Sequence, residues 1–203
     1  MSARFRLLLP FLLACALSAN ATTLTDVSTG IELTVQPGGT FTINVHQPAW
    51  TFGGEIGQPL NNLSPRSGMD EIGRYREIVF HYAQDGAREG AIRLYQGLPI
   101  VLFSIKYLEA AKNLAPFPAF TQFPQGLDHL TYDGLFGKYS FAKFGSDSPW
   151  LFLDTSGNAF LLSPASHFLL ASTMRKQSHE ISAGIDPQIA GLPRGLSSGP
   201  SWS

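Results

Sequence analysis

The feature that most constrains the fold is a long succession of short apolar segments separated by turn residues. Residues 31–35 alternate between apolar and polar side chains, and residues 41–45 repeat this alternation after a Pro-Gly-Gly turn at 37–39. Side chains of a β-strand point alternately to its two faces, so an alternation of period two predicts strands with one buried face. The two segments are therefore expected to form a β-hairpin.

The rest of the chain continues this pattern with almost no helical periodicity. Further strands are expected at residues 49–56, 75–83, 91–95, 98–107, 139–144, 150–154, 159–163, 168–173 and 179–185. Residues 58–68 are predicted to be a loop, residues 108–114 one helical turn, and residues 117–123 a rigid aromatic loop held by prolines. About ten to twelve short strands with turns between them predict an all-β fold, namely a two-sheet antiparallel β-sandwich.

The first residues resemble an export signal. Arg4 and Arg6 precede an apolar run over residues 7–17, and Ala19-Asn20-Ala21 fits the small-residue pattern at which signal peptides are cleaved. The run is shorter than the roughly 20 apolar residues that a membrane-spanning helix needs. We expect residues 1–21 to be a signal peptide cleaved after Ala21, and the mature protein to be periplasmic or extracellular.

Cys15 is the only cysteine, and it lies inside the predicted signal peptide. A lipid anchor on Cys15 is the alternative to cleavage after Ala21, although the residues before Cys15 fit the lipoprotein pattern poorly. After cleavage the mature chain has no thiol for a disulfide, so its core alone must stabilise it. Residues 22–190 are long enough for one such domain. Residues 191–203, rich in Gly, Ser and Pro, are predicted to be a disordered tail.

The charge and motif content argue against several functions. Removal of Arg4 and Arg6 leaves 12 basic residues against 15 acidic residues, which disfavours nucleic acid as a partner. The five histidines show no metal-ligand spacing, and no glycine-rich phosphate-binding motif occurs, so no metal site and no cofactor are predicted. No segment of the mature chain is apolar and long enough to be a transmembrane helix.

A weak candidate ligand site lies in the aromatic second half of the chain. It consists of Asp128, His129, Tyr132, Asp133 and Trp150. Aromatic rings beside acids can bind sugars, because rings stack on sugar C–H faces while carboxylates accept hydrogen bonds from hydroxyls. The same rings also build sandwich cores, and such acids often cap turns. No residue is predicted to be catalytic.

The region from Tyr75 to Asp186 resembles the N-terminal β-sandwich of secreted bacterial glycosidases of the α-galactosidase and raffinose-synthase type. The resemblance rests on the segments 98–103, 143–145, 148–154 and 163–168. It implies a large two-sheet sandwich of the galactose-mutarotase-like (supersandwich) kind. In those proteins a (β/α)₈ barrel follows and carries the catalytic carboxylates. The resemblance therefore implies a catalytic barrel as a missing partner domain, a truncated gene product here, and no catalytic residue in this chain.

Three functions follow from these observations. The first is a non-catalytic, carbohydrate-associated domain of an exported glycosidase-like protein, inactive as this chain alone. The second is an exported structural or adhesion-type sandwich without a small ligand. The third is a small sugar-active enzyme that uses dispersed acids and a histidine, with His129 beside Asp128 or Asp133 as the candidate pair.

Overall fold

The fold was analysed in a computed structural model, which describes residues 20–112, 114–133, 138–140, 149–166, 171–176, 180–185, 189–195 and 197–198. The predicted signal peptide lies outside these residues except for Asn20 and Ala21, which are exposed. The first strand begins at Thr22, directly after the predicted cleavage position.

The described residues form strands, turns and irregular segments but no helix, which confirms the all-β class. The strands of the first half are β1 (Thr22–Asp26), β2 (Ile31–Val35), β3 (Thr40–Val45), β4 (Trp50–Glu55), β5 (Asn61–Met69), β6 (Arg74–Ala83), β7 (Ala87–Tyr95), β8 (Val101–Tyr107) and β9 (Ala111–Lys112). Those of the second half are β10 (Ala119–Gln122), β11 (Asp128–Asp133), β12 (Lys138–Ser140), β13 (Trp150–Leu153), β14 (Ala159–Leu162), β15 (Ala171–Lys176), β16 (Glu180–Ile185), β17 (Gly191–Leu192) and β18 (Ser197–Ser198).

The largest sheet has seven antiparallel strands in the order β1-β2-β3-β4-β10-β16-β15. The predicted hairpin forms its second and third strands, β2 and β3: Leu33 pairs with Ile43, and both are buried on the same face. Gly54 in β4 allows β10 to approach, because a Cβ there would lie 1.9 Å from the carbonyl oxygen of Ala119.

The second large sheet has five strands in the order β18-β8-β7-β6-β5. Strands β6, β7 and β8 form the meander that the apolar segments predict, with Ile78 opposite Ile92 and Ile92 opposite Phe103. Alternate residues of β7 are buried, so this sheet has one face in the core and one face outward.

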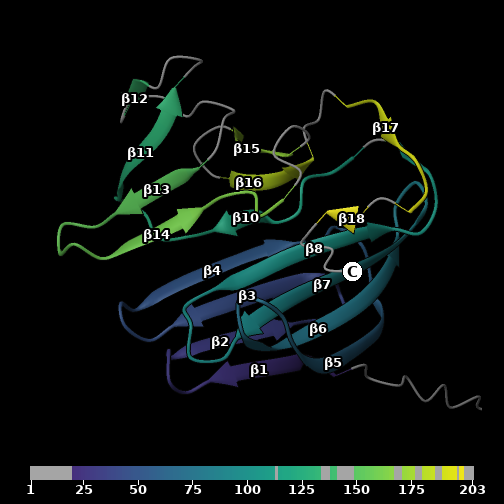
Figure 1. The fold of residues 1–203 in the computed structure, drawn as a ribbon, viewed down its shortest axis with the longest axis horizontal. Coiled ribbons are helices and arrows are strands. Elements are labelled where there is room, and N and C mark those ends of the chain that lie inside the picture. Colours follow the sequence, from purple (N-terminus) through teal and green to yellow (C-terminus); the bar gives the residue numbers. More distant parts are fainter. Residues whose placement is uncertain are drawn as a thin grey trace, which may run out of the picture.

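The two large sheets pack face to face through aromatic side chains, which makes the fold an antiparallel β-sandwich (Figure 1). Phe41 of β3 meets Phe103 of β8 with ring centroids 5.4 Å apart, and Phe117 meets Phe80 of β6 at 6.1 Å. The rings meet edge to face, the arrangement that the quadrupole of an aromatic ring favours. The core is thus continuous from the seven-stranded to the five-stranded sheet.

A smaller sheet lies above this sandwich in Figure 1, with the strand order β12-β11-β13-β14. Its β13–β14 hairpin is the one expected at residues 150–163, with a turn at 155–158. A two-stranded sheet joins β17 to β9.

Four segments differ from the sequence expectations. Residues 117–123, expected to form a rigid aromatic loop, contain β10, which pairs with β4 and β16 inside the seven-stranded sheet. The segment predicted as a loop at 58–68 contains β5, an edge strand, where Pro65 is tolerated because only one neighbour pairs with it. The predicted helical turn at 108–114 contains β9, which pairs with β17 from the distant end of the chain. Residues 191–203, expected to be disordered, contain the short strands β17 and β18; the described residues end at Ser198.

Candidate binding cleft

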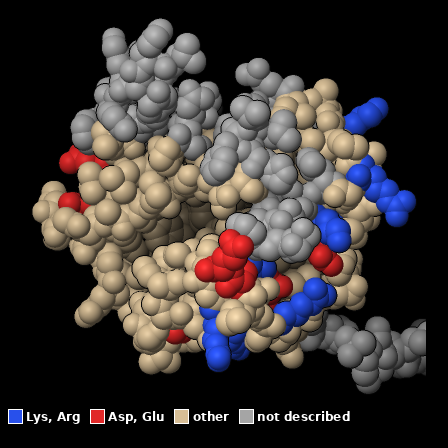
Figure 2. Space-filling view, in the orientation of Figure 1, with Lys and Arg blue, Asp and Glu red and all other residues tan. Residues whose placement is uncertain are grey.

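A cleft of about 400 Å³ opens between the sandwich and the four-stranded sheet. Its walls come from β2, β3, β4, β8, β10, β14, β15 and β16, and from connecting residues, among them those that follow β14. The space-filling view shows a hollow in the middle of this face, with walls that are largely neither acidic nor basic (Figure 2). The cleft is therefore lined by residues of three different sheets, and these residues are far apart in the sequence.

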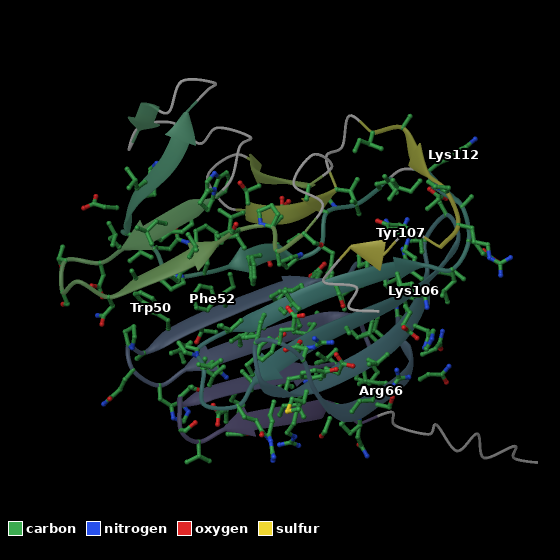
Figure 3. All side chains as sticks on the ribbon, viewed as in Figure 1. Trp50, Phe52, Arg66, Lys106, Tyr107 and Lys112 are labelled. Carbon is green, nitrogen blue, oxygen red and sulfur yellow. The ribbon has the colours of Figure 1, made fainter. Side chains whose placement is uncertain are left out.

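Half-buried aromatic rings line the cleft. Trp50 of β4, Phe103 of β8 and Phe160 of β14 keep part of their surface exposed, whereas Phe52 and Phe120 form the buried floor. Figure 3 places Trp50 and Phe52 together on β4, below the β13–β14 hairpin. Trp50 and Phe52 are both close to Phe160, with ring centroids 5.8 and 4.8 Å away, so β14 rests on β4 through these rings.

The cleft has no charged group among the described residues that line it. Its polar side chains are neutral ones, among them Thr29, Gln47 and Ser163. Most of the described side chains in these walls are apolar, and the polar ones offer neutral hydroxyl and amide groups. The chemistry of the cleft therefore suits binding of an uncharged, mainly apolar surface.

The hairpin that carries β14 is fixed by an acidic turn residue. The Asp154 carboxylate accepts hydrogen bonds from the backbone N–H groups of Ser156 and Asn158 at 2.9 and 2.8 Å. The Asn158 side chain also donates to it at 2.7 Å. These bonds, with that of the Asn158 side chain the strongest, lower the pKa of Asp154. Asp154 therefore stabilises the turn, as expected for an acid of this kind.

The site residues predicted from the sequence lie on β11 and β13, outside the cleft. Asp128 is exposed, whereas His129 is half-buried and packs on Phe152 with ring centroids 6.4 Å apart. Asp128 and His129 are neighbours in one strand, so their side chains point to opposite faces. Asp133 is four residues along from His129, about 13 Å at the rise of a strand. Strand geometry thus separates both expected acid–base pairs.

The aromatic members of the predicted site have different positions. Trp150 is 0% exposed and packs against Phe152 at a centroid distance of 6.3 Å. It is a core residue, with no exposed ring face for a sugar. Tyr132 pairs with Tyr139 in the ladder between β11 and β12, and the side chains of Tyr132 and Asp133 lie outside the described residues. The sequence analysis did not select Trp50 and Phe160, which line the cleft. Their positions in alternating strands are the same as those of core residues, so the sequence pattern could not identify them as cleft residues.

Arg93, on the outer face of β7, is at the centre of a charged cluster that fixes the β5–β6 turn. Its guanidinium binds Asp70 at 2.7 Å and Glu77 at 3.0 Å and stacks 3.6 Å from the centre of the Tyr75 ring. Tyr95 donates a second hydrogen bond to Asp70 at 2.6 Å. Burial opposes ionisation of Asp70, but these bonds and the backbone N–H groups of the turn outweigh it and lower its pKa.

Arg88, on the inner face of the same strand, has a different environment. Its side chain is 1% exposed, and among the described residues its Nε and Nη2 atoms lie within hydrogen-bond geometry of no acceptor. Nη1 donates a long hydrogen bond to the Gln84 side chain at 3.4 Å, and the guanidinium lies 5.2 and 5.8 Å from the Tyr107 and Tyr82 ring centres. Burial raises the pKa of Tyr82, while the charge of Arg88 and its hydrogen bond with the Tyr82 hydroxyl oppose that shift. No carboxylate of the described residues forms an ion pair with it.

Comparison with known proteins identifies no relative: no family model, no curated protein and no solved structure matches this chain. Within the described part of the chain, no three acidic, histidine or cysteine side chains come together as metal ligands would. The same residues include no helix of the length and apolar character needed to cross a membrane.

Proposed function

We propose that this chain is a non-catalytic β-sandwich domain of an exported, carbohydrate-associated protein of the glycosidase-like kind, and that its aromatic cleft docks an uncharged polypeptide surface. The observation that carries the docking role is the cleft itself, with half-buried rings and no charged group among its described lining residues. The carbohydrate association rests on the sequence resemblance. The pairing of a seven-stranded with a five-stranded sheet supports a sandwich of the large galactose-mutarotase-like type.

The ring geometry favours a polypeptide over a sugar as the docked surface. A sugar stacks on an open ring face and needs polar groups that bind its hydroxyls. In the cleft Trp50, Phe52 and Phe160 meet one another edge to face, so neighbouring rings cover much of each face. Apolar side chains fill the spaces between such rings without needing polar partners, and their burial contributes about 25 cal/mol per Å² of apolar surface.

Binding to a peptide array tests this proposal. We expect the full chain to bind nine-residue peptides that carry Val, Leu or Phe at several positions. Trp50→Ala should weaken this binding by about tenfold or more, as expected when an aromatic anchor is removed. Met69→Ala is the control, because Met69 is 73% exposed on β5 and does not line the cleft.

Two results would contradict the proposal. One is calorimetric binding of neutral oligosaccharides that Trp50→Ala abolishes, because it would make the cleft a sugar site. The other is a chain whose peptide binding is the same with and without Trp50. Hydrolysis of α- or β-glycosides by the purified chain would separately contradict the non-catalytic role.

A further inference from the structure

Strand β14 is an edge strand of the four-stranded sheet, and no described strand pairs with its outer side. In Figure 1 it is the strand of that sheet nearest to β4. An unpaired edge exposes a row of backbone N–H and C=O groups that can pair with another chain.

The ladder register shows which groups of β14 point outward. Asp154 N–H donates to the Asn158 carbonyl oxygen at 2.9 Å, so these two residues form a hydrogen-bonded pair. In an antiparallel ladder such pairs alternate with pairs that exchange no hydrogen bonds. Ala159 is opposite Leu153, and Leu161 is opposite Leu151, so both belong to pairs that exchange no hydrogen bonds. Their N–H and C=O groups point away from β13, toward the free edge.

The composition of the cleft wall indicates that this free edge faces the cleft. From β3 and β4, alternate residues line it, as when a strand presents one face. From β14 and the residues after it, the consecutive run 159–166 lines it. Residues 101–103 of β8 are also consecutive in the lining, and they too lie at an edge, because β18 pairs only with residues 105 and 106 of β8. A strand contributes consecutive residues when its edge, rather than its face, borders a space. The cleft thus joins an unpaired strand edge to apolar pockets.

We propose that the cleft binds an extended polypeptide segment, which adds to β14 as a fifth strand of the four-stranded sheet. This rests on the proposed docking function and specifies its partner. The outward groups of Ala159 and Leu161 would form backbone hydrogen bonds with the segment. Alternate side chains of the segment would enter the cleft beside Trp50 and Phe160. In strand addition, the backbone hydrogen bonds generally provide affinity and the side-chain pockets provide specificity. The uncharged walls select apolar residues at those positions.

Backbone substitution in the peptide is the direct test. The probes are nine-residue peptides with Val, Leu or Phe at every second position, Thr or Ser between them and Lys at each end. N-methylation of alternate peptide bonds removes donors from one edge while retaining the side chains. We expect methylation in one of the two registers to weaken binding to the full chain by about tenfold per essential hydrogen bond, and methylation in the other register to have little effect.

Substitution in the protein provides the matched test. Leu161→Pro removes an N–H that points away from β13 and should weaken peptide binding about tenfold more than Leu161→Ala does. Leu161→Ala keeps the N–H and removes most of a side chain that lines the cleft and is 60% exposed, so it measures the side-chain contribution to binding alone. If Leu161→Pro does not fold, amide exchange in the wild-type protein decides: the Leu161 amide should exchange rapidly in the free chain and slow at least about tenfold with saturating peptide.

The outcomes separate this inference from the proposed function. One outcome is peptide binding that depends on Trp50 yet is the same for both methylation registers, with the exchange rate of the Leu161 amide unchanged by peptide. That result would overturn strand addition and leave the proposed docking function intact. Absence of any peptide binding would overturn both. Binding that follows one register and protects Leu161 would support both.

Discussion

Replacement by methionine should destabilise the fold at Arg93 but not at Arg88, the two arginines of β7. Arg88 and Arg93 lie five residues apart, on opposite faces of the same strand. Arg93 is 16% exposed and has two carboxylate partners, whereas Arg88 is 1% exposed and forms no ion pair with a described carboxylate. Methionine has a similar length and no charge, so the comparison isolates the guanidinium group.

The expected magnitudes follow from these environments. Arg93→Met leaves Asp70 and Glu77 without their cation and should lower the free energy of unfolding by about 3 kcal/mol. Burying the Arg88 cation costs several kcal/mol of desolvation free energy, and no described carboxylate offsets this cost. Arg88→Met removes that cost. It also removes cation–π contacts with two tyrosines, worth about 1–2 kcal/mol each. We therefore expect Arg88→Met to be neutral or to raise the free energy of unfolding by about 1–2 kcal/mol.

Urea denaturation at pH 7, followed by circular dichroism, measures both effects through the midpoint and the slope. An unchanged slope would show that each substitution acts on stability rather than on the extent of unfolding. A loss of more than about 2 kcal/mol in Arg88→Met would refute the reasoning, because it would mean that the buried guanidinium stabilises the fold. Arg88→Gln provides a check that retains polarity without charge.

Two further predictions concern the sandwich itself. Gly90→Ala should destabilise the fold by about 2 kcal/mol or more through overpacking, because the new Cβ would lie 2.2 Å from the Phe80 ring; Gly38→Ala, with nothing within 4 Å, is the neutral control, and equal denaturation midpoints for the two variants would contradict the packing. The lowered pKa of Asp70 means that its stabilisation is present above the unfolded pKa near 3.8 and is lost as pH falls through the lower folded pKa. Unfolding midpoints measured between about pH 2 and 5 should therefore fall with acid in wild type and depend less on pH in Asp70→Asn.

Local sequence pattern predicted the first hairpin and the meander, but it missed β1, although β1 pairs with its neighbour β2. The hairpin at 31–45 and the meander of β6, β7 and β8 follow from alternation and turn residues, because each strand pairs with its neighbour. The strands that the pattern missed have other causes. Strand β5 contains Pro65, which only an edge position tolerates. Strand β9 pairs with β17, about 80 residues away, so no local signal could reveal it.

The cleft could not be predicted for a related reason. Trp50 and Phe160 have the spacing of ordinary core residues, and they line a cleft only because the β13–β14 hairpin lies across β4. Two members of the predicted site, Asp128 and His129, point to opposite faces of β11 because side chains alternate along a strand. Trp150, which has the same residue type as Trp50, is completely buried. Alternation thus predicts which residues share a face, but not which face another sheet covers.

The most direct test of the docking cleft is a nuclear magnetic resonance titration of the isotopically labelled full chain. One arm uses the tightest-binding peptide of the array and the other uses neutral oligosaccharides. We predict that the peptide shifts the Trp50 indole and the Leu161 amide resonances while Met69 and the other residues of β5 stay unchanged, and that the oligosaccharides shift neither. Peptide-induced shifts confined to surfaces outside the cleft, or sugar-induced shifts at Trp50, would contradict the assignment of the cleft as a polypeptide docking site.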